Sequence, residues 1–322
     1  MKLVGDVGGT KVLLALAAAD GTLVEKRRLP SADFQGFDEL LAAYLRDVAA
    51  PLDGGCLAVA GPVADDSRRA RLTNLPWTID AAALEARFGL GPLVLINDFA
   101  GVALGIAALA PERRVTLQAG EPLAAAPRLV VGAGTGLGMA VLLPEGKRWR
   151  VLPGEGGNTA FAPADAQQAA LWTWLHARKG RVIWEDVVSG PGLANIHRFF
   201  GGGELTPEEI AAAAVGGAAA AGAAIELFLS CYGAYAGDMA LALLPRGGVY
   251  LAGGIAAKLL PQLRAGAFLA AFNAKERHAC VTARMPVCVV TDEEAGLAGA
   301  ALQALGAVVD YSQQAAISAV YK

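Results

Sequence analysis

Twice in this chain, an apolar run enters a glycine turn and leaves it as a second apolar run. The turns are Gly8-Gly9 and Gly134-Thr135-Gly136. The flanking runs are Lys2 to Val7 with Lys11 to Leu16, and Arg128 to Ala133 with Leu137 to Leu143. Runs of this length on either side of a short glycine connection are typical of β-hairpins. A chain that repeats its opening hairpin much later in its length is expected to contain two copies of one fold.

The segments after each hairpin repeat an order of strands and helices, told apart by their apolar periodicity. The first set is expected at Thr22 to Leu29, Phe37 to Val48, Leu57 to Ala60, Ile79 to Phe88 and Leu93 to Ile96. The second set is expected at Trp149 to Leu152, Pro207 to Leu244, Val249 to Ala252, Pro286 to Val290 and Glu294 to Leu305. The 322 residues exceed the usual size of a single core. We therefore predict an α/β fold of two duplicated lobes around a central cleft.

Composition and charge exclude several classes of partner. A net charge of -3 gives no basic field, so neither nucleic acid nor an anionic membrane is expected as a partner. The longest apolar stretch, Ile210 to Ile225, is too short to span a bilayer. No signal-peptide pattern follows Met1, so we expect a cytoplasmic protein that acts on a small molecule. The four cysteines and three histidines lack metal-ligand spacing, which predicts reduced thiols rather than a zinc site.

The first glycine turn has the composition of a phosphate site. Its residues are Gly5, Asp6, Val7, Gly8, Gly9 and Thr10. Glycine permits a left-handed backbone and a close approach, so successive N–H groups of the turn are expected to form an anion cradle, to which Thr10 adds a hydroxyl. Asp6 is then placed to hold Mg²⁺ through water. A Gly-Gly turn by itself is usually just the turn of an ordinary hairpin.

The second turn, Gly134, Thr135 and Gly136, makes the phosphate interpretation stronger, because two cradles can hold one polyphosphate from two sides. The chain has no Walker-type motif, and a strand rather than a helix follows these glycines, which argues against a Rossmann site. Gly253 and Gly254, after a later apolar strand, form a third glycine site that is expected to admit adenine or ribose.

Asn97 and Asp98 follow the apolar run from Leu93 to Ile96. The carboxyl ends of such buried strands are where α/β proteins bind ligands. Asp98 has two interpretations: it caps the helix expected from Gly101 to Leu109, or it accepts a proton from a sugar hydroxyl. We favour the second, because a positioned carboxylate base accelerates phosphoryl transfer to an alcohol.

Further carboxylates and amides lie beside flexible backbone in the second half of the chain. Glu155 and Asn158 follow a strand, and Glu185 lies in the segment from Trp184 to Gly192, which is expected to begin a helix that ends at glycine. Carboxylates and amides bind vicinal sugar hydroxyls through paired hydrogen bonds. Taken singly, each of these side chains is more typical of a solvated loop, but together with Asn97 and Asp98 the three are the predicted sugar ligands.

In these residues the sequence resembles the bacterial glucokinase family, which has the actin and hexokinase type of ATPase fold. The resemblance spans nearly the whole chain. It is carried by Val4 to Thr10, Ala60 to Val63, Leu72 to Trp77, Ile96 to Phe99, Gly132 to Gly138, Leu152 to Gly157, Ser189 to Leu193 and Leu251 to Ile255.

The resemblance implies an ATP-dependent kinase that converts glucose to glucose 6-phosphate with Mg²⁺, in a cytoplasmic homodimer. It implies that Asp98 is the general base, that the turns at Gly8 and Gly134 hold the phosphates, and that Gly253-Gly254 holds adenosine. It also implies two ribonuclease-H-like lobes. We expect a small lobe over residues 1–108 that is completed by a helix over 295–322, and a large lobe over 109–294.

Two departures from the family pattern bear on specificity. The family usually carries His and, two residues later, Asp after the Glu-Gly-Gly motif, where this chain has Asn158 and Ala160. Lys11 replaces a frequent Asn and resembles the repressor and kinase relatives, whose cysteine-rich zinc motif this chain lacks. We therefore favour the zinc-free glucokinase branch.

Three alternatives remain at this stage. A kinase of another hexose, such as mannose or N-acetylglucosamine, would share the base and the phosphate turns. A non-catalytic sugar sensor or repressor is disfavoured because no helix-turn-helix precedes the first phosphate strand. An actin-like polymer subunit has no need of Asn97, Asp98, Glu155 and Glu185 together.

Overall fold

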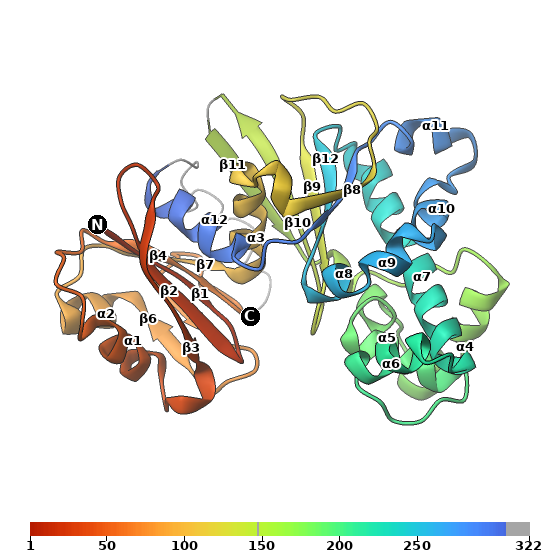
Figure 1. The fold of residues 1–322 in the computed structure, drawn as a ribbon, viewed down its shortest axis with the longest axis horizontal. Helices are drawn as coiled ribbons and strands as arrows, with labels where there is room; N and C mark the ends of the chain where they lie inside the picture. The colour runs from red at the N-terminus through yellow and green to blue at the C-terminus, as the bar shows by residue number, and fades with distance from the viewer. Residues whose placement is uncertain (147, 307–322) are drawn as a thin grey trace. The chain divides into compact units, whose positions relative to one another are not determined.

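The computed structural model describes residues 1–146 and 148–306 and has a mixed α/β fold with two compact units. Unit 1 contains Met1–Leu109, Leu142–Leu152 and the described residues from Glu294 onward; unit 2 contains Ala110–Val141 and Pro153–Glu293. Residues 307–322 of the predicted C-terminal element lie outside the described residues. Figure 1 labels the helices and strands.

Unit 1 has a five-stranded sheet in the order β3-β2-β1-β4-β7. β1 pairs antiparallel with β2 and parallel with β4, and β4 pairs parallel with β7. The strands are β1 Lys2–Val7, β2 Lys11–Ala17, β3 Leu23–Pro30, β4 Gly55–Val59 and β7 Leu93–Asn97, and a separate hairpin of β5 Arg69–Arg71 and β6 Thr78–Asp80 was not predicted. Because β1, β4 and β7 are parallel, their carboxyl ends lie at the same edge of the sheet.

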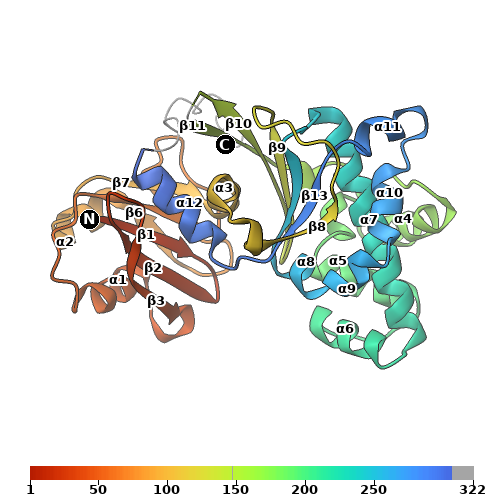
Figure 2. The ribbon, with the colours of Figure 1, turned by 45° about the horizontal axis from the view of Figure 1, so that its top comes forward.

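Two helices pack side by side against this sheet, α3 Asp98–Gly105 and α12 Ala295–Ala304 (Figures 1 and 2). Glycines allow their close approach: a methyl group at Gly299 would lie 1.8 Å from the carbonyl oxygen of Gly101. A separate apolar core joins the sheet to α1 Phe37–Leu45 and α2 Ala81–Phe88, with Leu14, Leu40 and Tyr44 fully buried. The start of α3, which carries Asp98, is thereby held by α12 and by β4 and β7.

Unit 2 contains most of a six-stranded sheet in the order β11-β10-β9-β12-β13-β8. β12 pairs parallel with both β9 and β13, whereas the unpredicted edge strand β8 is antiparallel to β13. The strands are β8 Arg114–Gln118, β9 Arg128–Ala133, β10 Leu137–Glu145, β11 Arg148–Gly154, β12 Gly248–Ala252 and β13 Val287–Val290. Apart from β8, this order repeats that of the first sheet, with a three-stranded meander beside two parallel strands.

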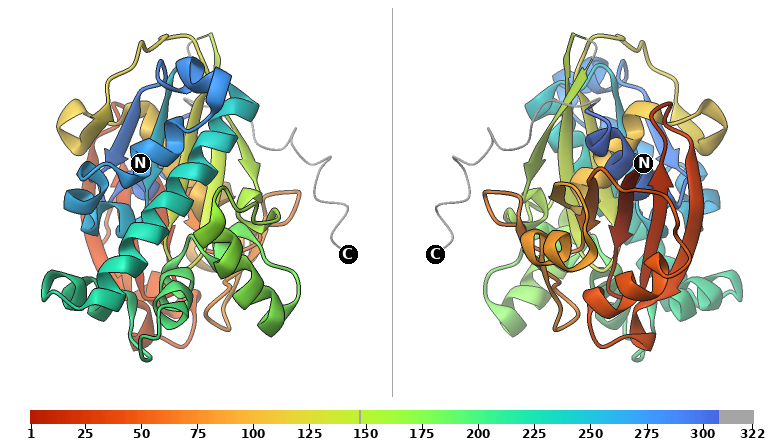
Figure 3. Two further views of the ribbon diagram at one scale, coloured as in Figure 1. Left: turned by 90° about the vertical axis from the view of Figure 1, so that its right-hand side faces the viewer. Right: turned by 90° about the vertical axis from the view of Figure 1, so that its left-hand side faces the viewer.

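The helices of unit 2 include one long buried helix, α7 Ala219–Leu243, which runs across the sheet in Figure 3. The predicted single helix from Pro207 to Leu244 is wrong, because Gly216-Gly217 separates α6 from α7 and Gly217 has a φ of +85°. α7 has the length and composition of a membrane span, but 67% of its apolar window is buried inside the protein. The other helices are α4 Ala166–Lys179, α5 Gly190–Phe199, α6 Pro207–Val215, α8 Gly254–Lys258, α9 Leu260–Arg264, α10 Ala267–Asn273 and α11 Ala279–Thr282.

Short 3₁₀ turns connect several of these elements, and two of them carry predicted sugar ligands. They are η1 Ser31–Asp33, η2 Ile106–Ala108, η3 Pro111–Arg113, η4 Gly156–Asn158, η5 Trp184–Asp186 and η6 Glu276–His278. The segment from Trp184 to Gly192 was expected to be a helix ending at glycine. Instead η5 ends at Asp186, Ser189 caps α5 through the Gly192 amide, and the glycines begin the helix.

Candidate active site

Asn97 and Asp98 lie at the junction of β7 and α3, and the structure gives them different tasks. Asn97 is the N-cap of α3: its Oδ1 accepts hydrogen bonds from the amides of Phe99 (3.0 Å) and Ala100 (3.3 Å). The capping interpretation of Asp98 is therefore wrong, because the preceding residue fills that role. The Nδ2 of Asn97 donates to Gly61 O at 3.3 Å and to Asp98 Oδ1 at 2.9 Å. All hydrogen-bonding positions of the Asn97 amide are thus in use within unit 1.

The carboxylate of Asp98 is anchored through one oxygen only. Oδ1 accepts from the amide of Phe99 at 2.8 Å and from Asn97, whereas Oδ2 makes no hydrogen bond in residues 1–146 and 148–306. Burial raises the pKa of Asp98, and its hydrogen bonds from Phe99 and Asn97 only partly oppose that shift. An oriented carboxylate of raised pKa with one open oxygen is suited to accepting a proton.

Asp6 lies near the end of β1, where the charge of Asp98 acts on its carboxylate. Burial and then the charge of Asp98 raise the pKa of Asp6 to about 6, and Lys11 acts in the opposite direction. The Asp6 side chain also packs against α12, since a methyl group at Gly296 would lie 2.7 Å from its Oδ2. A carboxylate whose proton affinity is raised by a neighbouring carboxylate would gain from a divalent cation, so Asp6 fits the predicted Mg²⁺ site. No cluster of three metal-binding side chains occurs among the described residues.

The first glycine turn presents two open amides in sequence. Gly8 N donates to Lys11 O across the turn at 3.0 Å, and the hydroxyl of Ser31 donates to Gly8 O at 3.1 Å. The amides of Gly9 and Thr10 have no partner in the described part of the chain. The expected left-handed backbone is wrong here, because Gly8 and Gly9 do not have positive φ. Glycine instead provides room: a methyl group at Gly8 would lie 3.0 Å from Lys11 O.

The second turn repeats this arrangement in unit 2. Gly134 N donates to Gly136 O at 2.8 Å, and the amides of Thr135 and Gly136 have no partner within the described ranges. Gly134 and Gly136 lack positive φ, as Gly8 and Gly9 do. Each turn thus uses its first glycine amide internally and leaves the next two amides open, as an anion cradle requires.

Gly253 places the third glycine site directly beside the second turn. Its φ is +85°, and a methyl group there would lie 2.6 Å from the carbonyl oxygen of Ala133, the last residue of β9. The left-handed backbone expected of a site glycine therefore occurs at Gly253. The end of β12 and the start of α8 at Gly254 consequently adjoin the turn at Gly134.

The structure places Glu185 against the second glycine turn. Its Oε2 accepts a hydrogen bond from the amide of Leu137 at 2.8 Å, and a methyl group at Gly136 would lie 2.6 Å from that oxygen. The hydroxyl of Ser189 donates to Glu185 O at 2.7 Å and fixes η5 to the start of α5. This predicted sugar ligand is thus bonded to the backbone next to a predicted phosphate turn.

Glu155 and Asn158 lie at the two ends of one tight turn. The Nδ2 of Asn158 donates to Glu155 Oε2 at 3.3 Å, and the amide of Asn158 donates to Glu155 O at 3.0 Å. Both side chains are exposed. Arg181 donates to Asn158 O at 2.8 Å, which fixes the backbone of this turn.

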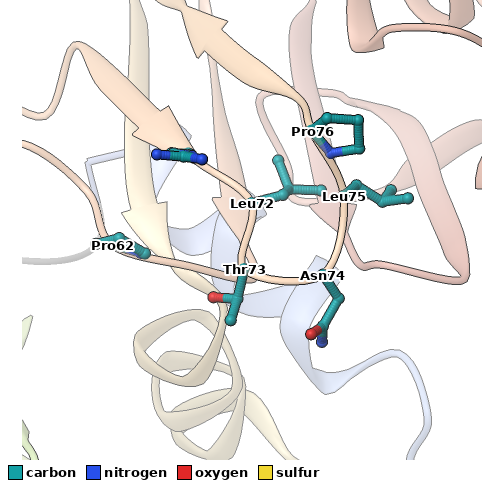
Figure 4. A pocket seen from close by; sticks show the side chains of 7 residues that line it. Pro62, Leu72, Thr73, Asn74, Leu75 and Pro76 are labelled. Atoms are coloured by element: carbon teal, nitrogen blue, oxygen red, sulfur yellow. The ribbon is translucent and has the colours of Figure 1, made fainter.

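A cavity of about 540 Å³ in unit 1 adds residues that the predicted site left out. It is lined by Pro62 and by the loop from Arg71 to Pro76, with Thr73 and Asn74 projecting from one side of that loop (Figure 4). Asn74 reaches the first glycine turn, because a methyl group at Gly9 would lie 3.2 Å from its Cβ. The loop belongs to the Leu72 to Trp77 motif that carried the family resemblance, so the signal was present without a role assigned to it.

Comparisons with known proteins show which family this chain resembles in sequence and fold. A family profile described as Glucokinase matches residues 3–307. A glucokinase of Chromohalobacter salexigens is 40% identical over 308 residues, which cover 92% of this chain and 95% of that relative. The crystal structure of a glucokinase from an Antarctic psychrotroph superposes with a TM-score of 0.84 at 31% identity, covering 94% of this chain and 98% of the other. A ROK family glucokinase from Streptomyces griseus, solved in complex with glucose and AMPPNP, shares the fold with a TM-score of 0.64 at 19% identity, covering 94% and 98% of the two chains.

Proposed function

This chain belongs to the glucokinase family, and we propose that it transfers the γ-phosphoryl group of ATP to glucose, giving glucose 6-phosphate. The observation that carries the proposal is the anchored carboxylate of Asp98, with one oxygen held by Phe99 and Asn97 and the other open. Two turns with paired open amides, each beside a carboxylate of the proposed site, support it further.

In the proposed mechanism, Asp98 is the general base. The open oxygen of Asp98 accepts the proton of the sugar hydroxyl as the hydroxyl oxygen attacks the γ-phosphorus and the bond from that phosphorus to ADP breaks. This proton transfer contributes typically ~10²–10⁴ in rate. Asn97 holds Asp98 in orientation through its Nδ2, and it binds sugar only by exchanging its 3.3 Å bond to Gly61 for a sugar hydroxyl. Glu155, Asn158 and Glu185 bind the remaining hydroxyls, where charged acceptors give the stronger bonds.

The phosphates of ATP are proposed to meet the open amides of the glycine turns. Gly5, Asp6, Val7, Gly8, Gly9 and Thr10 form the first phosphate site, and Gly134, Thr135 and Gly136 form the second. Gly253 and Gly254 border adenosine, which agrees with their place beside the second turn. Asp6 would hold Mg²⁺ through water, and bound Mg²⁺ neutralises charge on the phosphates during transfer.

The proposal includes the finer architecture that the resemblance implies: two ribonuclease-H-like lobes of the actin and hexokinase type, with the small lobe over 1–108 and 295–322 and the large lobe over 109–294. The repeated strand order of the two sheets supports it. We also propose a cytoplasmic homodimer, for which light scattering should give twice the mass of one chain.

A coupled assay of ADP production tests this function across glucose, mannose, fructose, N-acetylglucosamine and no sugar. We expect ADP to appear with glucose at the highest kcat/KM. A kinase of another hexose would reverse that preference through the same base and phosphate turns. Sugar-independent ADP release, or none with any sugar, would contradict a hexose kinase and favour the polymer subunit or the non-catalytic sensor.

A further inference from the structure

The hydroxyl of Tyr235 is buried beneath the turn that carries Glu155 and has no hydrogen-bond partner in residues 1–146 and 148–306. Tyr235 lies in the middle of α7 and is 0% exposed. Buried hydroxyls almost always have a partner, so an orphaned one calls for a physical reason. Its neighbour one turn earlier, Tyr232, is equally buried but donates to Val131 O at 3.3 Å.

The Tyr235 hydroxyl points at the backbone of Gly156, the residue after Glu155. A methyl group at Gly156 would lie 2.5 Å from the hydroxyl oxygen, so only glycine allows this approach. The Tyr235 ring also packs on Trp184 with centroids 5.4 Å apart, and Trp184 precedes Glu185. One side chain from the core therefore touches both segments that carry the proposed sugar carboxylates.

The carbonyl acceptors of the Glu155 turn are already in use. Glu155 O accepts from the amide of Asn158, and Gly156 O accepts from the amide and the hydroxyl of Thr159, the latter at 2.7 Å. The Glu155 carboxylate remains as an acceptor, with Asn158 Nδ2 as a long partner at 3.3 Å on one of its oxygens. Burial and then the charge of Glu155 raise the pKa of Tyr235, so the phenol keeps its proton and acts as a donor.

We propose that Tyr235 is a positioning residue whose hydroxyl donates a hydrogen bond to the Glu155 carboxylate when the sugar binds, and so holds that carboxylate against the sugar. This role rests on the function proposed above. In the free protein the donor is unsatisfied, which disfavours the unliganded state. The new bond forms only in the liganded state, so the hydroxyl contributes to sugar affinity rather than to folding.

The variant Tyr235→Phe separates these two contributions. Removing an unpartnered hydroxyl should leave the melting temperature unchanged or raised, while the KM for glucose rises about tenfold, equivalent to about 1.4 kcal/mol. The KM for ATP and kcat should stay within about twofold, because the base and the phosphate turns are untouched. The matched control, Tyr232→Phe, loses a made hydrogen bond. It should lower the melting temperature and leave the KM for glucose unchanged.

A double-mutant cycle with Glu155→Ala, which removes the acceptor, tests the partner. If Tyr235 acts through the Glu155 carboxylate, Tyr235→Phe should change the KM by less than about twofold in the Glu155→Ala background. A Tyr235→Phe variant with a lowered melting temperature and an unchanged KM would overturn the proposal and assign the hydroxyl a structural role. A full tenfold effect in both backgrounds would also overturn it, because Glu155 would then not be the acceptor. Failure of the proposed function is a separate result, seen as a wild-type protein that phosphorylates no hexose.

Discussion

Replacing Asp6 with asparagine is expected to stabilise the fold at neutral pH while it lowers the turnover. Burial and the neighbouring charge of Asp98 raise the pKa of Asp6 from 3.8 to about 6. Each pKa unit corresponds to about 1.36 kcal/mol, so the ionised carboxylate costs the folded state up to about 3 kcal/mol. Because Asp6 is only half-buried, solvent screens part of this cost, and we expect the substitution to raise the free energy of unfolding by about 2 kcal/mol.

The sign of this effect sets its pH dependence. A carboxyl whose pKa is higher in the folded state binds its proton more tightly there, so the folded state is favoured at low pH and loses that advantage as pH rises. Wild type and Asp6→Asn should be equally stable below 3.8, the ordinary pKa of the group, and should diverge as the pH rises through about 6. Above that pH the difference should be constant, with the variant more stable.

Thermal unfolding between about pH 4 and about pH 8 measures the difference, and we expect the variant to melt roughly 5 °C higher at the upper end. Asp65→Asn, at an exposed position of the same unit, is the control and should show no such divergence. Turnover of Asp6→Asn should fall at least about tenfold at every Mg²⁺ concentration, because the amide carries no charge to hold the cation. A variant no more stable than wild type at about pH 8 would refute the assignment of Asp6 as a half-buried carboxylate with a raised pKa.

Three further substitutions test the remaining site residues. Asp98→Asn keeps the acceptor for the helix amide but cannot take a proton, so kcat should fall by ~10²–10⁴ while the KM values for glucose and ATP stay within about threefold. Retention of a tenth of wild-type turnover would remove Asp98 from the base role. Asn158→His should tighten apparent glucose affinity about threefold to tenfold with little change in kcat, and unchanged affinity for every hexose would show that this side chain faces away from the sugar. Gly136→Ala displaces the Glu185 carboxylate from its bond to the backbone and should raise the KM for glucose about tenfold. The control, Gly134→Ala, adds a methyl group that meets nothing within 4 Å, and equal effects of the two variants on that KM would contradict the placement of Glu185.

Hairpins, buried strands and turns follow from local patterns, which is why the sequence alone predicted them. The repeated glycine turns and the strand from Leu93 needed no distant contact to be recognised, because strand alternation and glycine punctuation are properties of neighbouring residues. The short hairpin β5–β6 and the edge strand β8 were missed. β8 is only partly buried and exists because it pairs with β13, far away in the chain.

The sequence also predicted which residues form the proposed site, but it did not predict the separate role of each residue. Asn97 and Asp98 stood together at a strand end, yet only the folded backbone decides that the first caps α3 and the second keeps an oxygen open. The raised proton affinity of Asp6 depends on burial and on a charge that is adjacent only in the tertiary structure. Tyr235 gave no signal in the sequence, since an apolar stretch of a helix does not show where one hydroxyl points.

The sequence determined which chemical groups this chain carries and on which local elements, because propensity and periodicity are short-range. The tertiary structure decided which of those groups are free to act, because hydrogen-bond saturation and desolvation depend on neighbours that folding alone brings into contact.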